Sequence, residues 1–122
     1  MILTSDGHPL VDASARTLGV RPRIDVPGDA TDYVDPGAGG MSVAIGTAAK
    51  LPDHRRPVVF GGSGTDPAFA MEEADLGPRL MLRVDSDGPS GHGFVEPVRR
   101  MIFDEYQDAI WATVAKWWLV ES

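Results

Sequence analysis

Two segments with alternating side chains and one segment that ends at a proline predict three short β-strands in this chain. In residues 80–84, Leu80, Leu82 and Val84 alternate with Met81 and Arg83. Residues 41–45 place their larger apolar side chains at every second position. Successive side chains of a strand point to opposite faces, so both segments have the pattern of strands. Residues 92–96 predict a third strand, which Pro97 stops because proline cannot donate to a sheet ladder.

The last quarter of the chain predicts a helix instead. Acidic residues favour a start near residues 102–104, and Lys116 lies near the other end, as the helix dipole prefers. The apolar residues form two adjacent rows, with Tyr106, Ile110, Val114 and Trp117 in one and Phe103, Trp111 and Trp118 in the other. Such a broad apolar face predicts a long helix that anchors the core.

Glycine and proline divide the chain into two unlike parts. The 14 glycines and 10 prolines are spread over residues 7–97 and are absent afterwards, which predicts strands and turns followed by helix. Tyr33–Val34 and Val58–Phe60 are two further short strand candidates. A chain of 122 residues is typical of one domain, so we expect residues 1–122 to form a single α+β domain.

Charge and residue content exclude several classes of function. The net charge of −7 is opposite to that of proteins that bind the nucleic acid backbone, so no such binding is expected. No apolar run is long enough to cross a bilayer, and the first residues lack the features of a signal peptide. The absence of cysteine fits a reducing compartment. We therefore expect a cytoplasmic protein without membrane contact, or one secreted into a target cell without a signal peptide.

Positive charge is concentrated at two points, His54-Arg55-Arg56 and Arg99-Arg100. Each group is either solvated surface or a binding site for an anionic ligand. The glycine-rich loop at 61–64 likewise is either a surface turn or a set of backbone amides that face an anion. The histidines are scattered, with no helical pair and no cysteine beside them, so we expect no metal site.

The strand at 92–96 carries two ionisable residues on one side. His92 and Glu96 lie four positions apart, about 13 Å along a strand, so they cannot touch but can border one cleft. A partly desolvated carboxylate at Glu96 could bind a sugar hydroxyl or stabilise positive charge. The alternative is a surface ion pair of Glu96 with Arg99 or Arg100. Ser42 lacks a nucleophile-elbow context, which by motif alone favours a strand serine bonded to the backbone.

Short motifs follow one another in a distinctive order between Arg21 and Trp117. The segments are Pro22-Arg23, Asp25-Val26, Tyr33, Gly39-Gly40 with Ser42-Val43, Gly64-Thr65 with Pro67, His92, Pro97, Met101 and the tryptophan-bearing helix. This order resembles the small type VI secretion effector toxins that have an ADP-ribosyltransferase-like fold. The first-strand arginine of that superfamily has no counterpart here, because Arg16 is the only arginine among residues 1–20 and its neighbours do not resemble that strand.

The resemblance implies an α+β domain with split small β-sheets, a long C-terminal helix and a cleft that takes NAD. In that activity the nicotinamide–ribose bond breaks and ADP-ribose passes to a target, through an oxocarbenium-like transition state that a carboxylate stabilises. The residues carried over are Glu96 and Ser42 as catalytic residues and His92, Arg55, Arg56 and Gly40 as NAD-binding residues.

The resemblance also implies a partner, which is either a cognate immunity protein or a protein target. The alternative function is a non-catalytic protein-interaction domain that keeps the same fold. Such a domain would bind its partner through the acidic surface or the aromatic helix.

Overall fold

The three segments predicted as strands form one antiparallel sheet. Strands β4 (Met41–Ala44) and β6 (Leu80–Val84) pair with the two sides of β7 (His92–Pro97), in the order β4-β7-β6. All three predicted strands are therefore confirmed. The computed structural model describes residues 4–5, 8–9, 18–20, 22–23, 26–28, 32–46, 62, 69–86 and 91–119.

Smaller two-stranded antiparallel sheets accompany this sheet. They pair β1 (Thr4–Ser5) with β2 (His8–Pro9), β3 (Tyr33–Val34) with β8 (Met101–Ile102), and β5 (Phe69–Ala70) with β9 (Trp118–Leu119). Small antiparallel sheets with one C-terminal helix confirm the α+β class, and β3 confirms the expected segment at 33–34. The strand predicted at 58–60 and the loop at 61–64, apart from Gly62, lie outside the described residues.

The C-terminal helix begins at the expected position and ends earlier than predicted. Helix α1 spans Phe103–Trp111, so the predicted continuation to Trp118 is wrong. The backbone N–H and the hydroxyl of Thr113 both donate to the carbonyl of Ile110, at 3.0 and 2.6 Å. Both bonds reach back three residues instead of the four of an α-helix, so the backbone tightens and continues as the 3₁₀ turn η4 (Val114–Lys116).

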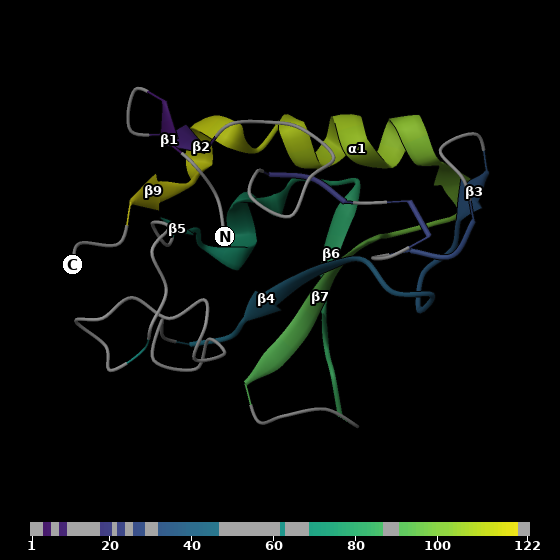
Figure 1. The fold of residues 1–122 in the computed structure, drawn as a ribbon, viewed down its shortest axis with the longest axis horizontal. Helices are drawn as coiled ribbons and strands as arrows, with labels where there is room; N and C mark the ends of the chain where they lie inside the picture. Colours follow the sequence, from purple (N-terminus) through teal and green to yellow (C-terminus); the bar gives the residue numbers. More distant parts are fainter. Residues whose placement is uncertain are drawn as a thin grey trace.

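The core lies between α1 and one face of the β4-β7-β6 sheet. Figure 1 shows α1 running along the top, with the sheet and the 3₁₀ turn η3 (Glu73–Leu76) below it. The predicted apolar face supplies much of this core: Phe103, Tyr106, Ile110 and Trp117 are buried, whereas Trp118 is exposed. No described helix is both long and apolar enough to cross a bilayer.

Helix α1 also holds a much earlier part of the chain through side-chain hydrogen bonds to its backbone. The Gln107 amide accepts from the N–H of Val20 and donates to its carbonyl, both at 2.9 Å. The indole N–H of Trp111 donates to the carbonyl of Leu18 at 2.9 Å. Leu18, Val20 and Gln107 are all buried, so these hydrogen bonds satisfy backbone groups that water does not reach. We call this arrangement the Gln107 clamp.

Candidate functional site

The strand register gathers several polar side chains on one face of the β4-β7-β6 sheet. Ser42 lies opposite Phe94 from β4, and Arg83 lies opposite Phe94 from β6. Opposed residues of antiparallel strands share a face, and His92 and Glu96 are two positions from Phe94 on β7, so all five lie on this side. We call the side with Ser42, Arg83, His92, Phe94 and Glu96 the polar face.

Glu96 lies at the end of the polar face and is completely enclosed. Its side chain is 0 % exposed. One carboxylate oxygen accepts from Arg83 Nε at 2.8 Å, and the other accepts from the backbone N–H groups of Gly37 and Gly39 at 3.1 and 3.4 Å. Three donors and a dry environment fix this carboxylate between β6 and the loop at 35–40, so in this arrangement it does not face a ligand.

The predicted alternative for Glu96, a surface ion pair with Arg99 or Arg100, is wrong. Arg99 instead pairs with Glu105 at 2.8 Å, and Arg100 approaches Asp35 at 3.6 Å. The physical reason is the sheet register, which places Arg83 diagonally across from Glu96, within reach of a long side chain.

Arg83 is the cation of the polar face, and its role was not evident from the sequence. Besides its bond to Glu96, its guanidinium carbon lies 4.9 Å from the centre of the Phe94 ring. The hydrogen bond from Arg83 to Glu96 raises the pKa of Arg83 above its already high ordinary value, so the guanidinium stays charged. The sequence did contain a signal for this pair, because Arg83 and Glu96 carry opposite charges on two predicted strands that a short connection joins.

His92 occupies the far end of the polar face. Its Nδ1 lies 2.8 Å from Oδ2 of Asp85, and its ring meets the Phe94 ring edge to face at 4.9 Å. Both His92 and Asp85 are partly exposed. His92 and Glu96 thus share a face of β7 as expected, but His92 is partly exposed and Glu96 is enclosed.

Ser42 is exposed on β4. No other described residue donates a hydrogen bond to the Ser42 hydroxyl or accepts one from it. It stands on the same face as Glu96, one strand away. Arg55 and Arg56 lie outside the described residues, so their predicted role in binding stays a prediction.

Gly40 has a packing role in this structure. A Cβ atom there would stand 2.5 Å from the carbonyl oxygen of Val95 and 2.6 Å from the hydroxyl of Tyr106. That hydroxyl donates to the Val95 carbonyl and accepts from the N–H of Met41 at 3.2 Å. Glycine therefore allows β4 to approach both β7 and α1, and Gly40 itself is buried.

We expect Gly40→Ala to lower the free energy of unfolding by about 1–3 kcal/mol, because the new methyl group overlaps backbone that cannot move freely. Urea denaturation would measure the change. Gly37→Ala is the control, since a Cβ at Gly37 meets nothing within 4 Å and only its positive φ of 83° is strained. Equal losses in the two variants would contradict the close-approach explanation.

The polar face meets the requirements of NAD only in part. A hydroxyl, an imidazole and a guanidinium, all partly or fully exposed, can face the ribose hydroxyls and the phosphates of a dinucleotide. The carboxylate that the reaction at the ribose requires is enclosed at Glu96. These residues therefore fit binding of NAD and, in this arrangement, do not fit the bond-breaking step.

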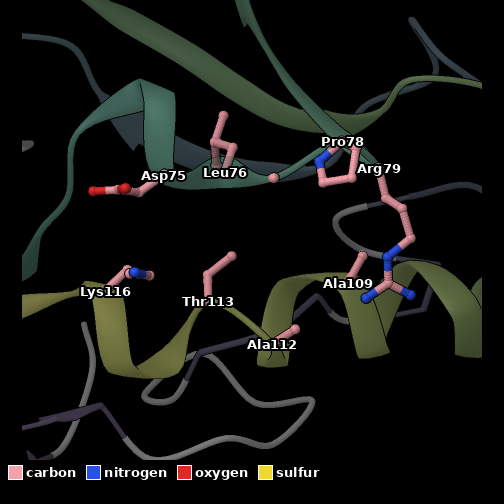
Figure 2. Close-up of a pocket in the computed structure, with 9 residues that line it drawn as sticks. Asp75, Leu76, Pro78, Arg79, Ala109, Ala112, Thr113 and Lys116 are labelled. Carbon is pink, nitrogen blue, oxygen red and sulfur yellow. The ribbon is translucent and has the colours of Figure 1, made fainter.

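A separate cleft of about 130 Å³ lies between the connection from η3 to β6 and the end of α1. Figure 2 shows Arg79 at one end of the cleft and Asp75 and Lys116 at the other. None of the residues predicted to bind or react lines it. Its volume is below the roughly 300–1,000 Å³ that is typical of small-molecule sites, so we do not assign NAD to it.

Within the part of the chain that the structure describes, no three histidine, aspartate or glutamate side chains gather into a group that could hold a metal ion. Comparisons of the chain with protein-family models, with curated protein sequences and with solved structures found no match.

Proposed function

We propose that this chain is an ADP-ribosyltransferase-like domain of the effector-toxin class that binds NAD on its polar face. The order of sequence motifs supports the class. The observation that carries the proposal is the common orientation of Ser42 and His92 on one antiparallel sheet, with Ser42 exposed and His92 partly exposed. In this proposal Ser42 shapes the ribose site and His92 adds a contact to the bound dinucleotide.

Glu96 has a positioning role in the same proposal. Its carboxylate holds Arg83 from one side and the loop at 35–40 from the other. Transfer of ADP-ribose would need a carboxylate next to the ribose, either from Glu96 after the loop moves or from another acid of the chain.

One observation favours a second candidate function, a non-catalytic protein-interaction domain. Glu96 is fully enclosed and its carboxylate accepts from Arg83, Gly37 and Gly39, as expected for a carboxylate that serves structure. A relative that keeps the fold and binds without reacting would have this arrangement.

Thermal denaturation with NAD separates the two candidates. If the polar face binds NAD, a ligand concentration ten times Kd adds about 1.4 kcal/mol of stability, which shifts Tm by several degrees. Ser42→Ala should reduce this shift, whereas Ser86→Ala, at an exposed serine in the turn after β6, should not. Release of free nicotinamide, compared between the wild type and Glu96→Gln, then tests for reaction.

The outcomes assign the function directly. A Tm shift with nicotinamide release supports the transferase. A shift without release supports a domain that binds NAD and does not react. No shift through the millimolar range of NAD excludes the first candidate and leaves the interaction domain.

A further inference from the structure

The outer side of the Arg83 guanidinium is a donor surface that no described residue uses. Among the described residues, only Glu96 accepts a hydrogen bond from this side chain, from Nε at 2.8 Å, and none accepts from the two Nη atoms. The side chain is 37 % exposed. A planar, partly exposed guanidinium whose two Nη atoms have no described acceptor has the geometry that binds phosphate or carboxylate oxygens in pairs.

The orientation of this donor surface is fixed before any ligand arrives. Glu96 cannot shift without breaking its bonds to Gly37 and Gly39, and it is fully buried. Phe94 supports the guanidinium from the β7 side, with 4.9 Å between the guanidinium carbon and the ring centre. A long side chain normally loses much conformational entropy when it binds, and this one has already lost it on folding.

The neighbours of Arg83 indicate what kind of anion would fit. Arg83, Phe94 and Ser42 form one row across three strands, which spans about 10 Å at the usual strand spacing. The row offers a cation at one end, an aromatic surface in the middle and an exposed hydroxyl at the other end. Arg83 can contact the diphosphate of a nucleoside diphosphate, and the exposed Ser42 hydroxyl can contact a ribose hydroxyl of the same ligand.

The acidic residues near Arg83 are already occupied. Glu96 is bound from three sides, and Oδ2 of Asp85 lies 2.8 Å from His92. These contacts reduce the repulsion of an incoming anion by the carboxylates of Glu96 and Asp85. Both carboxylates are also less exposed than the Arg83 guanidinium.

We propose that Arg83 anchors a diphosphate-binding site on the polar face, with Glu96 as its positioning residue. The ligand class is a nucleoside diphosphate. This inference rests on the proposed function, and in NAD the group that Arg83 would bind is the central diphosphate. Arg83 is then the phosphate contact for which the resemblance had suggested only Arg55 and Arg56.

Titration of ¹⁵N-labelled protein with inorganic pyrophosphate at constant ionic strength tests the site. The backbone amide signals of Ser42, Arg83 and Phe94 should shift, and those around Arg99 should not. Arg83→Gln should weaken binding by about tenfold or more, and Arg83→Lys should weaken it less because it keeps the charge without the paired donors. Arg99→Gln removes a surface arginine of another ion pair and should leave binding unchanged.

Additional ligands identify the group that is recognised. ADP should displace pyrophosphate, and adenosine, which has no phosphate, should not. Folding of each variant is checked by the dispersion of its NMR spectrum, and the wild-type shift map stands even if Arg83→Gln unfolds. Shifts that map away from the polar face, or equal affinities in wild type and folded Arg83→Lys and Arg83→Gln, would overturn the proposal.

The two proposals can fail separately. If pyrophosphate binds through Arg83 but NAD neither binds nor reacts, the diphosphate site stands and the proposed function fails. If NAD is bound or turned over equally well by folded Arg83→Gln, the proposed function stands and Arg83 is not its phosphate anchor.

Discussion

Gln107→Leu is expected to lower the free energy of unfolding by about 2–4 kcal/mol. Leucine keeps most of the volume but leaves the N–H and the carbonyl of Val20 without partners in a buried site. Each buried backbone group that loses its hydrogen bond costs about 1–3 kcal/mol. Urea denaturation measures the loss, and hydrogen exchange at the Val20 amide should accelerate in the variant.

Two further variants provide a comparison for the effect of Gln107→Leu on the free energy of unfolding. Trp111→Phe removes a single hydrogen bond, to the carbonyl of Leu18, and should cost less than Gln107→Leu. Asp108→Asn changes an exposed position of the same helix and should stay within about 0.5 kcal/mol of the wild type. A Gln107→Leu protein as stable as Asp108→Asn, with unchanged exchange at Val20, would show that the clamp does not stabilise the fold.

Glu96→Ala is expected to have a comparable effect, with a loss of about 3–4 kcal/mol. It opens a cavity at a fully buried position and removes the acceptor of Arg83 and of two loop amides. Large-to-small changes in a core and loss of hydrogen bonds to a charged group each contribute to a loss of this size. Unfolding in urea measures it, and faster exchange of the Gly37 and Gly39 amides would locate it.

Glu105→Ala is the matched control, because Glu105 also pairs with an arginine at 2.8 Å but at the surface. Surface pairs of this kind contribute about 0–1 kcal/mol. Glu96→Gln should fall between the two, since it keeps the shape and one acceptor while it loses the charge. Similar losses for Glu96→Ala and Glu105→Ala would contradict a structural role for Glu96.

The sequence predicted the elements whose signals are local. Alternation in residues 80–84 identified β6, and the acidic residues after Ile102 marked the start of α1. The end of α1 was missed, because the stripe of apolar residues continues while Thr113 diverts the backbone through its bonds to Ile110. Trp117 is still buried, since its indole N–H donates to the hydroxyl of Thr113 at 2.9 Å.

The residues of the candidate site were predicted less completely, because their contacts depend on strand register. Along the chain, Arg99 and Arg100 are the arginines closest to Glu96, and the sequence offered them as its partners. Arg83 becomes the partner only when β6 and β7 pair so that Arg83 opposes Phe94. Gln107 was missed for a related reason, as nothing near it in the sequence indicates that Val20 will lie against it.

The Gln107 clamp has a consequence for the order in which this protein matures. It joins residues separated by 87 positions, and the bond from Trp111 to Leu18 spans 93. A ribosome must therefore release Gln107 and Trp111 before the early segment can dock, and the nascent chain keeps Leu18 and Val20 unprotected until then. Closing so long a loop carries an entropic cost, which slows the formation of these contacts.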